Sequence, residues 1–345
     1  MTLSDIVRTM HYIMTGTATD SLASLSPMNC DDCQTPGKRF GKDRKGNQRF
    51  CCRTCRKTFS QRPERVLGDM RLPEDKALLC LHLLCEGSSV RAVERVTGVE
   101  KKTILRLLVQ VGEGCERMLS ETVQAVPVKD VQADELWTYI TAKQGTVARR
   151  KIASPDAGDA YCYIGMCRTS RLVLAWHLGR RNAWDAHDFI EKLGRATAGE
   201  FQLSTDGFSA YENAVEYAMG GRVDYGQVIK DFGNVGGEEG RRYAPPRLIG
   251  QEKVVVQGNP DEDRICTSHV ERGNWTLRGH LRRFTRLSNG FSRKKENLRA
   301  ALALYFAYYN FVRMHRSVRM TPAMAAGIAF KPWSLAELLA AAGAA

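Results

Sequence analysis

The spacing of apolar residues divides the chain into a helical stretch and a mixed stretch. Between Leu72 and Leu119, apolar residues recur at every third or fourth position, which is the period of a helix with one buried face. From Val128 onward, apolar and polar residues alternate in short runs, which is the period of a half-buried strand. The first pattern predicts helices over 73–85, 89–96 and 102–109. The second predicts strands over 128–140, 161–167, 172–178 and 201–205, helices over 183–198 and 210–218, and a long helix that begins near Ser268.

Five of the eleven cysteines are clustered near the N-terminus. Cys30 and Cys33 form one C-x2-C pair, Cys52 and Cys55 form a second, and eighteen residues separate them. Two such pairs bring four thiolates from two tight turns to the corners of a tetrahedron, the geometry that Zn2+ prefers. The short polar segments between the pairs predict a zinc ribbon, which needs structural Zn2+ because its core is too small to fold alone. Cys51 competes with Cys52, but adjacent side chains of a strand point to opposite faces, and Cys52 is the preferred ligand.

The chain is basic, with a formal net charge of +13 and a pI near 9.3. This surplus favours a polyanionic partner such as nucleic acid, although charge alone indicates only nonspecific attraction. Residues 38–65 carry eleven Lys or Arg and two acids, so one side of the ribbon is predicted to contact phosphates; a solvated basic face is the alternative. The chain has no apolar run of about 18 residues and no secretory pattern at its start. We therefore expect a cytoplasmic, nucleoid-associated protein with no membrane partner.

The three helices predicted between residues 72 and 119 have the order of a helix-turn-helix domain. Ser88 or Ser89 can cap the second helix, and Gly98 can make the turn before the third. The third helix is basic at its start, and in this motif that end enters the major groove of DNA. A three-helix packing module would have the same apolar spacing, but the basic zinc module in front of it favours DNA binding. The predicted groove contacts are Lys101, Lys102, Thr103 and Arg106.

Three acidic residues stand at distinctive places in the second half of the chain. Asp134 lies on the first predicted strand, Asp206 follows the strand over 201–205, and Glu271 lies on the helix that begins near Ser268. Strand ends that lead into helices often carry functional residues in α/β folds. A strand, a second strand end and a helix that each supply one carboxylate form the ribonuclease H-like arrangement, which gathers two Mg2+ (or Mn2+) ions for phosphoryl displacement. The sequence therefore predicts a DDE catalytic site.

Each of these acids also has an ordinary explanation. Asp134 fits an acid at a strand edge, Asp206 fits a helix cap, and Glu271 fits a surface residue paired with Arg. It is their joint pattern that favours a metal site. Glu135 competes with Asp134, but alternation sends the two side chains to opposite faces of the strand, so Glu135 is expected to be a bystander.

A second basic region follows the third acid. Residues 272–299 carry nine Lys or Arg and one acid. Basic side chains on helices beside a metal site can hold the phosphates of a nucleic-acid substrate; a solvated basic helix is the alternative. The apolar stretch over 291–312 is expected to form core or an oligomer contact. The predicted DNA contacts are Arg272, Asn274, Arg278, Arg282 and Arg283, with Asn274 orienting a water or a phosphate.

These features predict a multidomain α/β protein. Residues 1–27 are rich in Ser, Thr and Ala and have no clear period, and the helical pattern stops over 121–127. The predicted division is a flexible extension (1–27), a zinc ribbon (28–62), a helix-turn-helix domain (70–120), a ribonuclease H-like DDE catalytic domain (128–318) and a C-terminal tail (319–345).

In combination, the motifs resemble those of transposases of the insertion-sequence-one family. The resemblance covers residues 28–315. Two departures are the single continuous chain, where the best-known members use two overlapping reading frames, and two stretches that look inserted, 220–240 and 254–266. Neither departure touches the three carboxylates. The resemblance rests on the ribbon segment 48–59, the helix-turn-helix segments 91–99 and 103–106, the carboxylate segments 134–137, 205–207 and 269–274, and the shorter matches at 211–212, 277–278 and 280–281.

The resemblance implies a DDE transposase in which Asp134, Asp206 and Glu271 bind the catalytic metals. The ribbon and the helix-turn-helix would recognise the terminal inverted repeats of an insertion sequence. The catalytic domain would cut strands and join them to target DNA. Because two ends are joined in concert, a homodimer or larger assembly on double-stranded DNA is expected. The alternatives are a noncatalytic DNA-binding regulator of the element and a structure-selective nuclease.

Overall fold

The computed structural model describes residues 28–30, 32–44, 48–60, 66–68, 70–233, 247–285 and 288–344. The chain divides into two compact units, Met1–Arg65 and Val66–Ala345. Helices and sheets occur together, so the predicted mixed α/β class is confirmed. No helix within these ranges is long and apolar enough to cross a membrane. The extension predicted over 1–27 lies outside the described residues, and the finer division into domains stays a prediction.

The smaller unit contains an antiparallel sheet of three short strands, β1 (Gly37–Lys42), β2 (Gln48–Cys52) and β3 (Thr58–Ser60). Phe50 is buried and stacks on Phe59, with the two ring centroids 5.8 Å apart. Gly37 has to be small, because a Cβ atom there would lie 2.6 Å from the Phe59 ring. Apart from cysteines, Phe50 is the one apolar side chain buried among the described residues of this unit. Such a core is too small to stabilise a fold without further links.

The larger unit begins with three helices, α2 (Glu74–Cys85), α3 (Val90–Thr97) and α4 (Lys101–Thr122). The hydroxyl of Ser89 accepts a hydrogen bond from the Ala92 N–H and caps α3, as predicted. Gly98 ends α3 in the left-handed conformation with φ of 70°, where glycine is favoured. Unlike the prediction, α4 does not stop near residue 109 but runs for 22 residues.

The length of α4 is explained by two helices that come from the far end of the chain. A Cβ atom on Gly112 would lie 2.5 Å from backbone atoms of Ala300 in α9 (Lys295–Ala307), and one on Gly114 would lie 2.0 Å from the Ala342 carbonyl in α11 (Leu335–Ala344). The two glycines therefore allow both helices to approach the α4 backbone closely. The segment predicted as a C-terminal tail consequently belongs to the core, with Leu338 buried. Between α9 and α11 lie a π-helical turn, η4 (Tyr308–Val312), and α10 (Pro322–Ala325).

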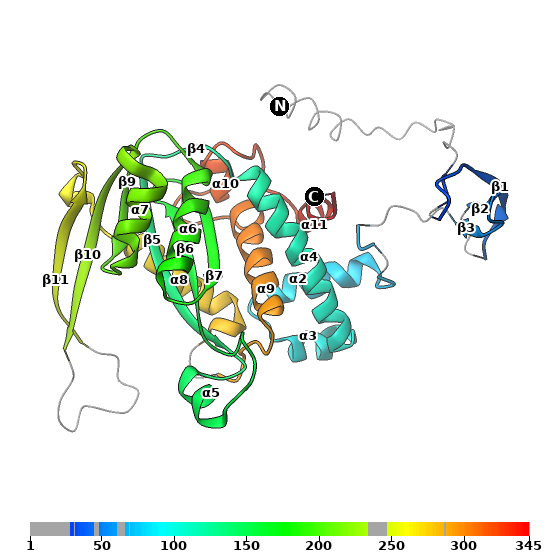
Figure 1. The fold of residues 1–345 in the computed structure, drawn as a ribbon, viewed down its shortest axis with the longest axis horizontal. Coiled ribbons are helices and arrows are strands. Elements are labelled where there is room, and N and C mark those ends of the chain that lie inside the picture. The colour runs from blue at the N-terminus through cyan, green and yellow to red at the C-terminus, as the bar shows by residue number, and fades with distance from the viewer. Residues whose placement is uncertain are drawn as a thin grey trace. The chain divides into compact units, whose positions relative to one another are not determined.

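The larger unit contains a six-stranded sheet with the order β11-β10-β9-β5-β6-β7, and the helices α4 and α9 lie on the β7 side of it (Figure 1). The strands β5, β6 and β7 are antiparallel neighbours, whereas β9 runs parallel to β5 and β10 runs parallel to β9. The edge strand β11 is antiparallel to β10. The bounds are β5 (Asp130–Ile140), β6 (Gly158–Cys167), β7 (Val173–Gly179), β9 (Phe201–Asp206), β10 (Val223–Gly233) and β11 (Arg247–Gln257).

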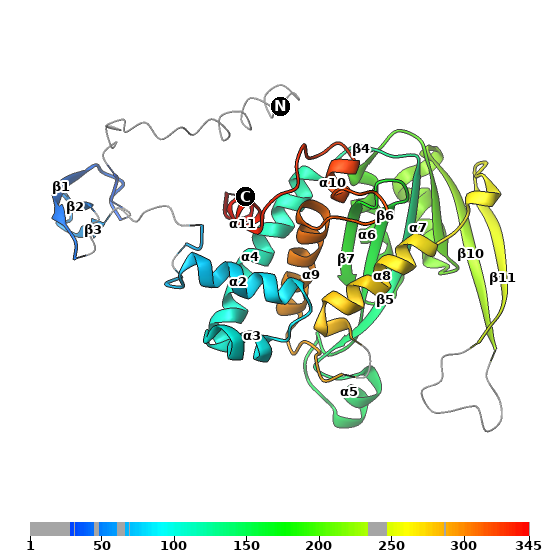
Figure 2. The same ribbon diagram turned by 180° about the vertical axis from the view of Figure 1, so that it is seen from behind.

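Helices cover both faces of this sheet. On one face α6 (Ala183–Ala196) and α7 (Ala210–Met219) pack side by side (Figure 1), and α8 (Ser268–His280) crosses β5 and β6 on the other (Figure 2). The first four residues of β5 are all buried, as expected for a strand covered on both faces. The remaining elements are β4 (Val126–Pro127), which pairs with β8 (Thr197–Ala198), the helix α5 (Gln144–Arg150), and the 3-10 turns η1 (Gly220–Arg222), η2 (Glu262–Arg264) and η3 (Arg282–Phe284).

The apolar spacing predicts no strand over the glycine-rich residues 220–240, yet β10 occupies much of this stretch. One of its glycines, Gly226, is required by close packing and not by a turn. A Cβ atom at that position would lie 2.5 Å from the Ile265 side chain. The glycine thus marks a close approach to a strand, a use that composition does not distinguish from a loop.

Candidate functional site

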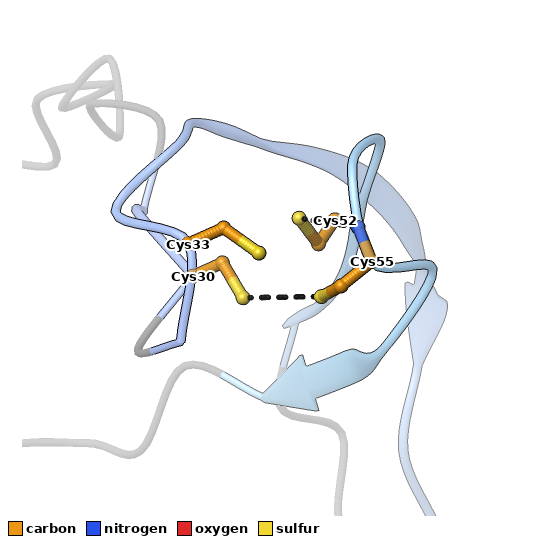
Figure 3. Close-up of side chains that lie close together, drawn as sticks. All are labelled: Cys30, Cys33, Cys52 and Cys55. Atoms are coloured by element: carbon orange, nitrogen blue, oxygen red, sulfur yellow. Dashed lines mark hydrogen bonds between the residues drawn. The ribbon is translucent and has the colours of Figure 1, made fainter.

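The four predicted zinc ligands converge in the smaller unit. The Sγ atoms of four cysteines all lie within 4.8 Å of one another: Cys30, Cys33, Cys52 and Cys55. Figure 3 shows their side chains turned toward a common centre. The Sγ atoms of Cys30 and Cys55 are 3.6 Å apart, and all four thiols are free. This donor set fits a tetrahedral structural Zn2+ site. Cys51 lies outside the group, so the preference for Cys52 is confirmed.

Hydrogen bonds prepare one of these sulfurs for the thiolate form. The Cys55 N–H and then the Thr35 hydroxyl lower the pKa of Cys52 to about 6. Conversely, interaction with the Cys55 sulfur is the main cause that raises the pKa of Cys33 to about 12. Four sulfurs so close together cannot all ionise without a cation among them. The cluster therefore suits a metal that takes thiolate ligands.

Asp134 and Asp206 lie on adjacent parallel strands of the larger unit. Asp134 is in the middle of β5, and Asp206 is the last residue of β9. Oxygens of Asp134, Glu135 and Asp206 all lie within 4.8 Å of one another. The Asn274 side chain on α8 donates to Asp134 Oδ2 over 2.8 Å, and the Glu135 N–H donates to its Oδ1, also over 2.8 Å. These two donors fix the orientation of the Asp134 carboxylate.

Glu271, the third predicted acid, lies on α8 close to this pair but is held by other groups. Its Oε1 accepts a hydrogen bond of 2.5 Å from the Thr267 hydroxyl and forms an ion pair with Lys230 of β10. These contacts hold the pKa of Glu271 below its ordinary value despite its partial burial. The charge of Glu271 nonetheless contributes to raising the pKa of Asp134. The structure thus brings Asp134 and Asp206 together, whereas Glu271 lies nearby in an ion pair with Lys230.

The expectation that Glu135 is a bystander differs from the structure. A carboxylate oxygen of Glu135 lies within 4.8 Å of oxygens of Asp134 and Asp206. Its Oε2 accepts a hydrogen bond of 3.2 Å from Arg181 Nε. Alternation fixes the direction in which a Cβ atom leaves a strand, but it does not fix where the end of a longer side chain lies. The oxygens of Glu135 and Asp134 approach each other near Asp206, where β9 ends.

Negative charge in the acidic cluster is only partly compensated. Burial, and then the charge of Asp206, raise the pKa of Asp134 to about 7 and that of Glu135 to about 8. Arg181 partly offsets this, since its Nη2 lies 3.6 Å from Asp206 Oδ2 and its guanidinium stacks on Phe208. Hard oxygen donors that repel one another in this way fit a divalent cation such as Mg2+ or Mn2+. Arg181 was not among the predicted site residues, because nothing in its sequence neighbourhood distinguishes it from the other arginines.

The DNA contacts predicted after Glu271 fall into two sets. The Arg272 and Arg282 side chains are exposed, and Arg272 stacks on Trp275, whose side chain is also exposed. The other three side chains make internal contacts. Arg278 donates to the Phe284 carbonyl over 2.8 Å, Arg283 donates to the Ser292 hydroxyl over 2.8 Å, and Asn274 is buried against Asp134. Burial lowers the pKa of Arg283 to about 10.

The predicted groove contacts on α4 surround its first turn. Lys101, Lys102 and Arg106 are exposed and Thr103 is half-buried. Thr103 and Arg106 also line an open groove of about 510 Å3, together with Arg71 and Lys76. Glu94 accepts a hydrogen bond of 2.9 Å from the Lys101 N–H and so ties α3 to the start of α4.

No protein-family model matches the chain, and no curated protein matches it.

Proposed function

We propose that this protein is a DDE transposase with a ribonuclease H-like catalytic domain, which binds the terminal inverted repeats of an insertion sequence and catalyses strand cleavage and strand transfer. The main support for the proposal is the position of three acids. The carboxylates of Asp134 and Asp206 lie close together on adjacent parallel strands, beside the helix that carries Glu271. Two further features support it. Three antiparallel strands are followed by parallel ones with helices on both faces, and the chain carries a surplus of 13 positive charges.

The acidic cluster suits phosphoryl transfer. Two Mg2+ or Mn2+ ions bound there would stabilise the attacking and leaving oxygens of an in-line displacement. Asp134, oriented by Asn274, and Asp206 would hold them, and Glu271 would join after parting from Lys230. In the first step water opens a phosphodiester bond at the end of the element. In the second, the freed 3′-hydroxyl attacks target DNA, and no covalent protein intermediate is needed.

A strand-transfer reaction with the DNA that flanks the coding sequence tests the proposal. Purified protein, Mg2+ and linear DNA with both inverted repeats should give joined products. Cleavage without joining would instead favour a structure-selective nuclease. End binding with neither cleavage nor joining would favour a noncatalytic regulator. The concerted joining of two ends is also expected to require a dimer or larger assembly, which light scattering of the DNA complex would detect.

Glu135→Gln is expected to weaken Mn2+ binding at the acidic cluster about tenfold. The change keeps the shape of the side chain but removes a carboxylate that meets Asp134 and Asp206. Calorimetric titration of the zinc-loaded protein with Mn2+ in the absence of DNA measures the affinity. Glu216→Gln, which removes an exposed charge from α7, is the matched control. Equal Mn2+ affinity in both variants would show that Glu135 takes no part in holding metal.

We also propose that α2, α3 and α4 form a helix-turn-helix domain that places the start of α4 in the major groove. Arg106→Gln is then expected to weaken binding to the inverted repeat by roughly 5- to 100-fold and to relax the preference for its sequence. Arg117→Gln makes the same change three turns further along α4 and serves as the control. Fluorescence anisotropy with repeat and scrambled duplexes measures both effects. If the two variants bind alike, α4 does not read the DNA from its first turn.

A further inference from the structure

An exposed tryptophan lies on α8, one helical turn after Glu271. The Trp275 side chain is 65% exposed, and across α8, all of which the structure describes, no other large apolar side chain is exposed. An indole left in water forgoes the free energy that burial would contribute. A single exposed apolar residue needs no function by itself. The surroundings of Trp275 therefore decide whether the ring has a ligand.

A guanidinium group lies against this ring. The guanidinium carbon of Arg272 is 4.4 Å from the centroid of the Trp275 ring, and the Arg272 side chain is exposed as well. A cation over an indole is attracted by the negative face of the ring. The contact joins two planar groups three residues apart on the helix, so that an aromatic surface and a positive charge are presented to solvent side by side.

The pair stands at the margin of the acidic cluster. Asn274, the residue before Trp275, is buried and donates a hydrogen bond of 2.8 Å to Asp134 Oδ2. Glu271 and Trp275 are four residues apart, so they share one side of the helix, with a rise of about 6 Å between them. Figure 2 shows α8 lying along the sheet that carries the other acids. A ligand that reaches the acidic cluster therefore also passes close to Trp275.

The character of this surface favours nucleic acid over a protein partner. Gly279, one turn beyond Trp275, is exposed, and a Cβ atom there would have no neighbour within 4 Å. Arg282, just after the helix, is exposed too. A protein interface needs a contiguous apolar patch at its core. One aromatic ring among exposed arginines, with open space beside it, is instead typical of a surface that stacks a base and contacts a phosphate.

We infer that Trp275, with Arg272 against it, forms a stacking site for an unpaired base of DNA. The inference rests on the proposed function for the identity of the ligand. Bases inside a duplex already stack on one another, so only an unpaired or terminal base has a free face for the indole. The rise of about 6 Å from Glu271 to Trp275 is close to two base steps of stacked DNA. The stacked base therefore lies within about two nucleotides of the reacting phosphodiester.

The two side chains contribute to binding in ways that salt separates. Stacking involves no counterion release, so Trp275→Ala should weaken binding without changing its dependence on salt concentration. Arg272 contributes a charge next to the DNA backbone. Arg272→Gln should therefore lower the log–log salt slope by about 1. Because Trp275 is exposed, its replacement should leave the melting temperature unchanged.

The test uses anisotropy titrations of the full-length, zinc-loaded protein, with Ca2+ in place of Mg2+. The probes are inverted-repeat duplexes that end either blunt or in a short single-stranded overhang, in 3′ and 5′ forms. Trp275→Ala should bind the preferred overhang roughly 5- to 150-fold more weakly and the blunt duplex almost as wild type does. Trp275→Phe, which keeps a ring, should retain most of the affinity. Trp184→Ala is the matched control, since Trp184 is 84% exposed on α6.

The fluorescent base 2-aminopurine in the overhang reports stacking directly. Wild type and Trp184→Ala should quench its fluorescence on binding, and Trp275→Ala should not. Equal quenching and equal affinity in wild type and Trp275→Ala would overturn the inference. So would a loss of affinity that is the same for blunt and overhang duplexes, or a change in the oligomeric state of DNA-free Trp275→Ala with overhang binding intact, which would make the ring a contact between copies of this chain.

The same measurements distinguish this inference from the proposed function. If wild type transfers strands and Trp275→Ala binds and quenches like wild type, the stacking site is wrong and the proposed function stands. If wild type quenches the overhang through Trp275 but neither cleaves nor joins DNA, the stacking site stands and the proposed function is wrong. If wild type binds no DNA, both are wrong.

Discussion

Asp206→Asn is expected to lower the rate of strand transfer by about 10³-fold or more while leaving binding to the inverted repeat unchanged. The change removes one of the two carboxylates that meet on adjacent parallel strands, and an amide oxygen is a poor substitute for a charged ligand. Asp206 is the last residue of β9, and Figure 1 shows this strand well separated from α3 and the α4 end next to it, where the exposed Lys101 and Lys102 begin α4. End binding should therefore survive. A single-turnover strand-transfer assay and an anisotropy titration measure the two quantities.

Stability provides an independent readout of the same variant. Burial raises the pKa of Asp206 above its ordinary value, so the folded state holds the proton more tightly than the unfolded state. The ionised carboxylate consequently lowers stability once the pH exceeds its unfolded pKa. Asparagine has no charge to bury, although it gives up the contact with Arg181. In the absence of divalent metal at pH 7, the melting temperature should be no lower than that of wild type.

Two comparisons make the result decisive. Glu271→Gln should also abolish strand transfer while end binding is retained. That result would assign Glu271 to the metal site, even though it forms an ion pair with Lys230 in this structure. Asp188→Asn, which removes an exposed acid from α6, should have no effect. Normal strand transfer by Asp206→Asn would rule out the metal assignment. Loss of strand transfer together with end binding would point to a folding defect, which the melting temperature would reveal.

Local rules predict the parts of this fold that depend on local physics. The hydroxyl of Ser89 and the left-handed Gly98 delimit α3 where the sequence indicates, because capping and backbone freedom are properties of a few adjacent residues. The preference for Cys52 over Cys51 also holds, because a cysteine side chain is short and the direction of its Cβ atom decides where the sulfur lies.

The same rule fails at Glu135 on β5. A glutamate carboxylate lies two bonds further from the backbone than a cysteine sulfur, so alternation no longer predicts its neighbours. Arg278 and Arg283 illustrate a related problem, since long basic side chains satisfy carbonyl and hydroxyl groups inside the protein as readily as phosphates. Composition alone does not separate these uses.

Contacts between distant segments were also beyond local patterns. The close approach of Gly114 to Ala342 explains why α4 is long and why the last residues are folded, but the two positions are far apart in sequence. In isolation, the alanine-rich end of the chain resembles a tail. The acidic site combines both kinds of feature. Asp134, Asp206 and Glu271 were predicted from their joint pattern, whereas Arg181 and Lys230, which form ion pairs with Asp206 and Glu271, become apparent only once β7 and β10 are in place.

Cys52→Ser is expected to abolish zinc binding, from about one Zn2+ per chain to a small fraction of that, and to unfold the smaller unit. The Cys52 side chain is fully buried among the other three ligands, and its sulfur is the one that hydrogen bonds favour as a thiolate. Phe50 and Phe59 alone give this unit too small a core to fold without metal. Loss of zinc should therefore remove the ribbon's contribution to recognition of the inverted repeat.

The neighbouring cysteine provides the control for this prediction. Cys51→Ser makes the same chemical change one residue away, but the Cys51 sulfur lies outside the ligand group and donates weak hydrogen bonds to the carbonyls of Cys52 and Arg56, at 3.7 Å. This variant should keep its zinc and its affinity for the repeat. Zinc content measured by atomic absorption, and repeat binding measured beside a scrambled duplex, separate the two variants. Because the larger unit has its own core, its melting temperature should be the same in both. A zinc-free protein that still binds the repeat normally would contradict a role for the ribbon in recognition, even if the metal site itself were correct.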